Sequence, residues 1–86
     1  MLNEIEVIEK LSGKHKFELK SGIDGFYELY LNGMPVFGVH DDDLPPNAPH
    51  DIRVRHAAML FETMVTDLTP AEFVAWVLDY YNTPGM

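Results

Sequence analysis

Residues 26–39, FYELYLNGMPVFGV, decide the fold of this chain. Residues 26–31 are dense in aromatic and aliphatic side chains, which is typical of a β-strand. Asn32-Gly33 follows, and both residue types tolerate the positive φ that a two-residue type I′ turn requires. The stretch therefore predicts a β-hairpin whose second strand covers residues 34–39.

The two-residue turn also predicts the register of this hairpin. The expected opposing pairs are Leu31 with Met34, Tyr30 with Pro35, and Leu29 with Val36. Because hydrogen-bonded pairs alternate along an antiparallel ladder, the nitrogen of Pro35 would point away from strand 26–31. A proline at that position is harmless where no further strand pairs on that side. Strand 34–39 is therefore predicted to lie at the edge of the sheet.

A third strand precedes the hairpin. Residues 15–20 alternate, with Phe17 and Leu19 on one side, and the glycine-containing segment 21–25 can turn the chain back. This gives a three-stranded antiparallel meander with strand 26–31 in the centre. The predicted faces are both apolar: one carries Leu29, Leu31, Met34 and Val36, and the other carries Phe26, Tyr30, Phe37 and Val39.

Helix signals lie on both sides of the meander. Asn3 and Glu6 form an N-terminal capping pattern for a short helix over residues 4–11, and Gly13 stands where a C-terminal cap is expected. Thr69-Pro70-Ala71-Glu72 is a strong start signal for a helix over 70–81. A further helix is predicted over about 50–66. The fold class is α+β, in one domain spanning residues 1–86.

The helix at 50–66 is amphipathic. Its predicted inner face carries Val54, Ala57, Phe61, Met64, Val65 and, just beyond the helix, Leu68, with Ile52 and Met59 nearly opposite. The apolar arc of helix 70–81 is wider than one buried face needs. One helix pair covers one face of a sheet, so the second face is left for the N-terminal helix, a second copy or a partner.

The charge pattern narrows the classes of function. The formal net charge is −8, and residues 1–20 contribute nothing to it, with four lysines and four glutamates. Residues 21–86 hold ten acidic residues against two arginines. Direct nucleic-acid binding needs clustered Lys and Arg, so it is not expected. The absence of cysteine excludes disulfides, and the N-terminal sequence lacks the features of a signal peptide, which favours a cytoplasmic location without membrane association.

The connector at residues 40–50 is acidic and rich in proline. His40, Asp42, His50 and His56 carry metal-binding side chains, but their spacing matches no known metal motif. Ser12 and Ser21 stand in turns without a neighbouring base. We therefore expect no metal, no cofactor and no catalytic residue.

The sequence favours a non-enzymatic protein-binding module. The concrete form is an inhibitor of a basic nucleic-acid-handling protein, of the anti-defence, DNA-mimic or toxin-immunity type associated with phages or mobile elements. The residues expected to contact the partner are acidic or aromatic: Asp41, Asp42, Asp43, Phe26, Tyr30, Phe37, Phe73, Trp76 and Tyr80. The alternatives are a homo-oligomeric (for example homodimeric) assembly or regulatory protein with incidental charge and, third, a small His/Asp metal-dependent enzyme.

Overall fold

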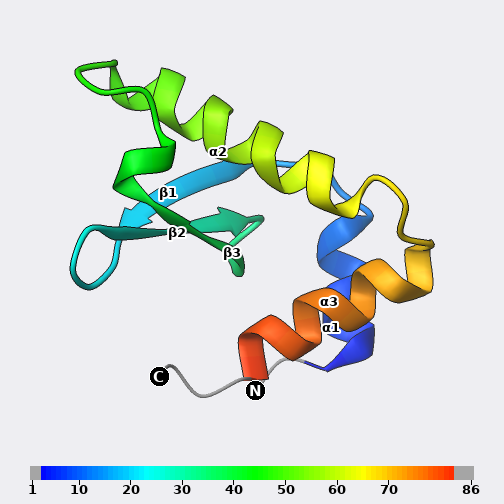
Figure 1. Cartoon of the computed structure of the whole chain (residues 1–86). Helices are drawn as coiled ribbons and strands as arrows, with labels where there is room; N and C mark the ends of the chain where they lie inside the picture. The colour runs from blue at the N-terminus through cyan, green and yellow to red at the C-terminus, as the bar shows by residue number, and fades with distance from the viewer. Residues whose placement is uncertain (1–2, 83–86) are drawn as a thin grey trace.

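A computed structural model describes residues 3–82 and has the predicted α+β architecture (Figure 1). The elements in chain order are α1 (Glu4–Leu11), β1 (Phe17–Ser21), β2 (Phe26–Leu31), β3 (Met34–His40), the 3-10 turn η1 (Asp41–Asp43), α2 (His50–Val65) and α3 (Pro70–Asn82). The strands form one antiparallel sheet in the order β1-β2-β3. The predictions of a central β2 and an edge β3 are confirmed.

The hairpin turn has the predicted chemistry. Asn32 has φ 49° and Gly33 has φ 82°, so both residues occupy the left-handed region that a type I′ turn requires. Asn32 also ties the turn to the end of α1. Its side chain accepts a hydrogen bond from the Lys16 amide at 2.7 Å and donates one to the Lys10 carbonyl at 2.7 Å. One residue therefore sets the hairpin turn and fastens the N-terminal helix to it.

The predicted register is wrong beyond the first two pairs. Leu31 pairs with Met34 and Tyr30 with Pro35, as expected, but Leu29 pairs with Phe37 because the ladder contains a β-bulge. The extra residue is Val36, next to the proline. A bulge places two residues of one strand opposite one residue of its neighbour, which breaks the alternation of faces.

The bulge moves two side chains to the other face of the sheet. Phe37 lies opposite Leu29, and Val39 lies opposite Tyr27 and is only 3% exposed. Side chains directly opposite each other share a face, so Phe37 and Val39 belong to the core face and not, as predicted, to the second one. The second face is therefore mixed in character, and carries Glu18, Lys20 and Glu28 beside Phe26 and Tyr30.

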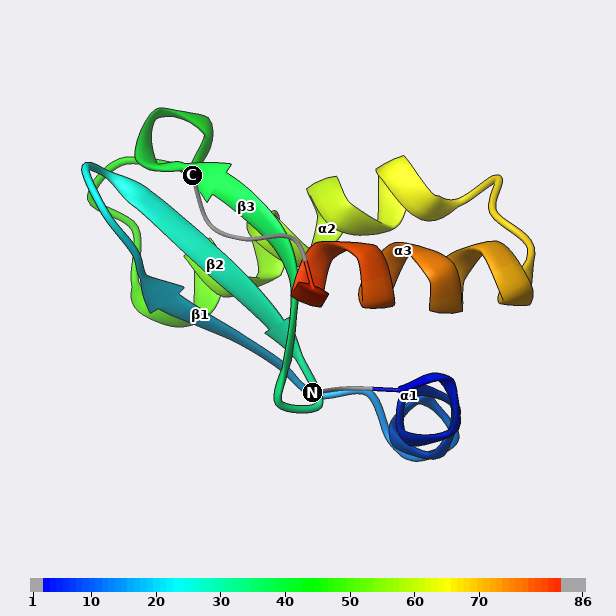
Figure 2. The same cartoon turned by 90° about the horizontal axis from the view of Figure 1, so that it is seen from below.

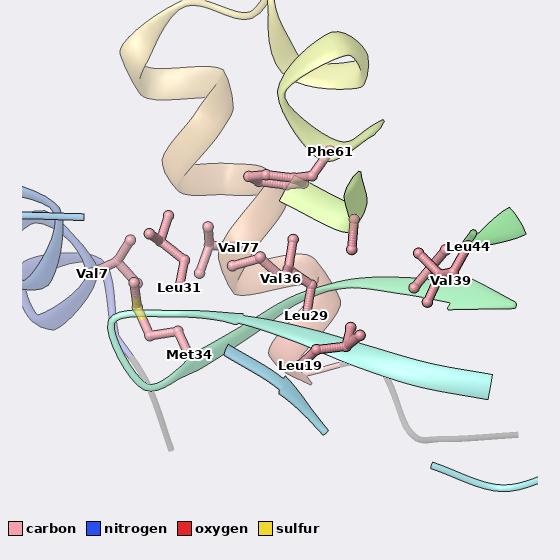
Figure 3. Packing of buried hydrophobic residues seen from close by; sticks show 11 residues of the cluster. Val7, Leu19, Leu29, Leu31, Met34, Val36, Val39, Leu44, Phe61 and Val77 are labelled. Atoms are coloured by element: carbon pink, nitrogen blue, oxygen red, sulfur yellow. The ribbon is translucent and has the colours of Figure 1, made fainter. Parts of the chain in front are cut away.

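The core lies between the sheet and α2, and Phe61 is its centre. Phe61 is 1% exposed, and its ring lies 5.8–6.4 Å from the rings of Phe17, Phe37 and Phe73. Met64, predicted on the same inner face, is 53% exposed, and the neighbouring Val65 packs against the core instead. Figure 3 shows the aliphatic side chains that fill the space between Phe61 and the strands.

The two terminal helices pack together beside the sheet. Val7 of α1 is fully buried and joins Leu31, Met34 and Val77 in the core (Figure 3). α1 contacts α3, so it does not cover the second face of the sheet. Figure 2 views that face from the side opposite α2, with α3 beside β3. We call it the open face.

The N-terminal caps of α1 and α3 form as the sequence predicts. The Asn3 side chain accepts a hydrogen bond from the Glu6 amide at 2.9 Å. Thr69 and Glu72 exchange backbone-to-side-chain bonds of 2.9 and 3.2 Å, which is a complete capping box. The C-terminus of α1 differs from the prediction, because Ser12 is the cap and Gly13 does not adopt a positive φ.

Candidate functional site

The aromatic residues expected to bind a partner divide into two groups. The ring of Phe37 packs at a tilt, and the ring of Phe73 edge-on, against Phe61 in the core. Trp76 is half-buried, and its indole Nε1 donates a hydrogen bond of 2.8 Å to the carbonyl of Val36. Val36 is the bulge residue and has no partner in the β2–β3 register, so the indole binds a carbonyl at the irregular point of the edge strand. These three aromatic residues hold α2, α3 and the sheet together.

The other three aromatic residues lie on the open face. Phe26 is 53% exposed and packs edge-on against the ring of His40, with ring centres 4.8 Å apart. Tyr30 lies two residues beyond Glu28 on β2, so both side chains point to this face. Tyr80 reaches it from α3, where its hydroxyl oxygen lies 3.3 Å from the point a Cβ on Gly38 would occupy. A side chain at position 38 would therefore press on this hydroxyl, and Tyr80 would have to shift slightly.

A cluster of polar groups surrounds Tyr30. We call Lys20, Glu28, Tyr30, Tyr80 and Tyr81 the open-face cluster. The Tyr30 hydroxyl donates a hydrogen bond of 3.3 Å to Glu28 Oε2. Lys20 lies directly opposite Glu28 in the β1–β2 register, and its Nζ lies 4.3 Å from the centre of the Tyr30 ring. The cluster thus combines one carboxylate, one ammonium group and three phenols.

The environment of the cluster stabilises the neutral phenols. Partial burial raises the pKa of Tyr30 above its usual 10.0. The charge of Glu28, its hydrogen bond to Tyr30 and the nearby Tyr81 raise this pKa further, in that order. Burial also raises the pKa of Tyr80, with smaller effects from Glu28 and Tyr30. Burial disfavours the ionised phenol, and the charge of Glu28 disfavours a second negative charge beside it.

The three aspartates of the connector do not form one uniform acidic tip. Asp41 Oδ1 accepts a hydrogen bond from the Arg53 guanidinium, which also donates to the Pro45 carbonyl at 2.9 Å. The hydrogen bond to Asp41 raises the pKa of Arg53. Asp42 and Asp43 are exposed. Asp41 therefore fixes the connector to α2, and its charge is offset within the chain.

Further contacts hold the connector against the core. The guanidinium carbon of Arg53 lies 5.4 Å from the centre of the Tyr27 ring. Leu44, next to the aspartates, is only 3% exposed and belongs to the core. The connector is acidic and rich in proline, but its middle is anchored by an apolar side chain.

The histidines that carry metal-binding side chains contact other groups. His40 Nδ1 accepts a hydrogen bond of 3.1 Å from the Asp42 amide, and the same nitrogen lies 3.3 Å from Asp42 Oδ2. His50 begins α2, and His56 lies half-buried within it. Among residues 3–82, no group of three or more histidine, aspartate or glutamate side chains is placed to hold a metal ion.

The two serines lie at the ends of elements. Ser12 caps α1, and its hydroxyl donates to the Glu9 carbonyl at 2.7 Å. Ser21 is exposed at the end of β1.

Sequence reasoning missed an apolar groove between α1 and α3. It has a volume of about 510 Å³, and its lining is predominantly apolar: Ile8, Leu11, Ser12, His15, Leu68, Pro70, Phe73 and Val74. The lining residues come from two segments, one near each end of the chain, so no local sequence pattern could reveal their proximity. The available sequence signal was the pair Ile5 and Ile8 in α1. A helix that packs on one side only leaves apolar residues of its other side exposed, and in the structure these two are 69% and 50% exposed.

The carboxylates are distributed over the surface, and none is buried. In residues 21–82 both arginines lie beside aspartates of the same segment, since Arg53 contacts Asp41 and Arg55 lies 3.7 Å from Asp51. This segment therefore presents carboxylates to its surroundings while its two arginines are already engaged. No helix within residues 3–82 has the length and apolar character needed to cross a membrane.

Comparisons with protein-family models, with curated proteins and with solved structures found no match to this chain.

Proposed function

We propose that the protein is a non-enzymatic binding module that recognises a basic surface on another protein. The observation that carries the proposal is the excess of acidic over basic residues after position 20. Residues 21–86 hold ten acidic residues and two arginines, and both arginines are engaged by aspartates. A surface of this kind attracts Lys- and Arg-rich partners over distances beyond direct contact.

The concrete form of the proposal is an inhibitor of a nucleic-acid-handling protein, of the anti-defence, DNA-mimic or toxin-immunity type. Proteins that bind nucleic acid do so through Lys and Arg that neutralise phosphates. Carboxylates on a small rigid domain can occupy the same groups and so compete with the nucleic acid. The net charge of −8 on 86 residues supplies the attraction.

The test is capture of partners on the immobilised protein at low ionic strength, followed by elution with either salt or duplex DNA. The Debye length falls to about 3 Å at 1 M salt, so a complex held by charge should dissociate steeply as salt increases. Duplex DNA should displace the same partner, because it competes for the same cations. A complex that withstands both eluents would refute the inhibitor proposal.

The apolar groove favours a second candidate, a homo-oligomeric assembly or regulatory protein. An exposed apolar groove flanked by exposed isoleucines is a common feature of interaction surfaces. Light scattering after gel filtration tests it. A dimer whose mass does not change with salt, and which Ile8→Glu dissociates, would support assembly. Ile23→Glu is the matched control, because Ile23 is 80% exposed in the β1–β2 turn and does not line the groove.

A further inference from the structure

The open face of the sheet combines aromatic rings with a carboxylate at its centre. Glu28 lies between Lys20 on β1 and Gly38 on β3 in the register of the sheet. Gly38 leaves space above the sheet, and the Tyr80 hydroxyl fills it from α3. Two elements distant in sequence, β2 and α3, therefore build one surface around the Glu28 carboxylate.

The chain already places a cation on this surface. Lys20 Nζ lies 4.3 Å from the centre of the Tyr30 ring, within the range of a cation–π interaction, and Glu28 is its cross-strand neighbour. The Lys20 side chain is exposed and flexible. Its ammonium group can therefore leave the ring at a small cost in free energy, and the side chain regains conformational entropy. It therefore indicates the chemistry of the external ligand that could replace it.

An arginine side chain fits this surface better than a lysine does. A guanidinium group is planar, stacks on aromatic rings and donates two parallel hydrogen bonds to one carboxylate. Tyr30 supplies the ring face, and Glu28 lies within hydrogen-bond distance of that ring's hydroxyl. The raised pKa of both Tyr30 and Tyr80 keeps these phenols neutral, so Glu28 supplies the negative charge of the cluster.

We infer that the open-face cluster of Lys20, Glu28, Tyr30, Tyr80 and Tyr81 is the docking site for an arginine side chain of the basic protein partner, which displaces Lys20 from Tyr30. The inference rests on the proposed function and assigns it a surface. It differs from the sequence prediction, in which the carboxylates that contact the partner are those of Asp41, Asp42 and Asp43 in the connector.

The probe is a nine-residue arginine peptide, titrated into the isotopically labelled protein at low ionic strength and followed by NMR. Amide shifts should be largest for β2 around Glu28 and Tyr30 and for the end of α3. Glu28→Gln should weaken binding about 5-fold, as expected for loss of a partly exposed charged pair. Glu62→Gln is the matched control: it removes the same charge from an exposed position on α2 and should cost at most about 2-fold.

A second pair of variants tests the displacement of Lys20. Lys20→Gln should strengthen binding of the arginine peptide, because the internal competitor is lost. Lys16→Gln removes an equal charge from an exposed lysine that lies near Glu18 (3.9 Å) instead of Tyr30, and should strengthen binding less. Equal effects of the two lysine variants would overturn the displacement. A nine-residue lysine peptide that binds as tightly would overturn the preference for arginine.

The remaining outcomes separate the inference from the proposed function. If the arginine peptide binds but Glu28→Gln and Glu62→Gln weaken it equally, or if the shifts map to residues 41–43, the docking site is wrong and the proposed function stands. If the peptide does not bind the unaltered protein at low ionic strength, both are wrong.

Discussion

Asn32 offers the sharpest test of how this small fold is held together. Its side chain makes two hydrogen bonds of 2.7 Å to the backbone of residues 10 and 16, and its φ of 49° lies in the left-handed region. A typical hydrogen bond contributes about 0.5–1.5 kcal/mol, so the two together contribute about 1–3 kcal/mol. Left-handed backbone costs alanine roughly 1–2 kcal/mol more than it costs glycine.

Two variants separate these contributions. Asn32→Gly keeps the backbone conformation and loses both bonds, so we expect a loss of about 1–3 kcal/mol in the free energy of unfolding. Asn32→Ala adds the backbone strain, for a total of about 2–5 kcal/mol. These are large fractions of the stability expected for 86 residues, which is about 4–13 kcal/mol. Urea denaturation followed by circular dichroism measures both.

Asn47 provides the matched control. It has φ 58° in the connector, and its side chain makes no hydrogen bond to any residue between 3 and 82. Asn47→Gly reports the effect of glycine on the unfolded chain, and Asn47→Ala adds the left-handed strain alone. If Asn32→Gly destabilises no more than Asn47→Gly, the side-chain hydrogen bonds of Asn32 to Lys10 and Lys16 contribute nothing. If Asn32→Ala is as stable as Asn32→Gly, the strain argument fails.

Three further predictions test the core, the sheet edge and the open face. Phe61→Ala should cost about 3–5 kcal/mol in a denaturation experiment, while Met59→Ala on the exposed side of α2 should cost little; similar losses would contradict the assigned core. Trp76→Phe keeps a ring but leaves the buried carbonyl of the edge strand without its donor, so unfolding by circular dichroism should show a loss of about 1–3 kcal/mol, and an unchanged midpoint would argue against that bond. Because the folded pKa of Tyr30 is raised, its stabilising contribution is complete below the usual value of 10.0 and is lost as pH rises through the folded value. Glu28→Gln should lower that folded pKa, measured by ultraviolet titration of the phenols, and an unchanged curve would place the charge of Glu28 too far away to act.

The sequence was sufficient for the elements and their order because the signals are local. Asn32-Gly33 fixes a turn within two residues, and Thr69 with Glu72 fixes a helix start within four. The strand order followed from Pro35, whose missing donor excludes a neighbour on one side. Each of these arguments uses the backbone requirements of a few adjacent residues.

The facing of the second half of β3 could not be predicted, because one bulge residue inverts it. Val36 is the extra residue, and Phe37 and Val39 consequently face the helices. Nothing in the alternation of residues 34–39 marks where a bulge falls, since every side chain there except Gly38 is apolar or a proline. The tertiary requirement to bury Phe37 against Phe61 decides it.

The candidate site was predicted in part. Tyr30 and Tyr80 were named from the sequence, and the structure brings them to one surface. Glu28 was missed, although its position between Phe26 and Tyr30 on one strand places all three on the same face. Tyr81 was also missed, because its proximity to Tyr30 depends on how α3 packs beside β3.

The contact between Trp76 and β3 bears on how the protein avoids self-association through its backbone. An edge strand with free amides and carbonyls is a template for another chain, and proteins block it by several means. On β3, pairing with another chain is hindered by Pro35, by the bulge at Val36 and by the hydrogen bond from the Trp76 indole to the Val36 carbonyl. β1 relies on a length of five residues and the alternating charges of Glu18 and Lys20. Growth of the sheet into fibrils is therefore opposed at both of its borders, by different chemistry at each.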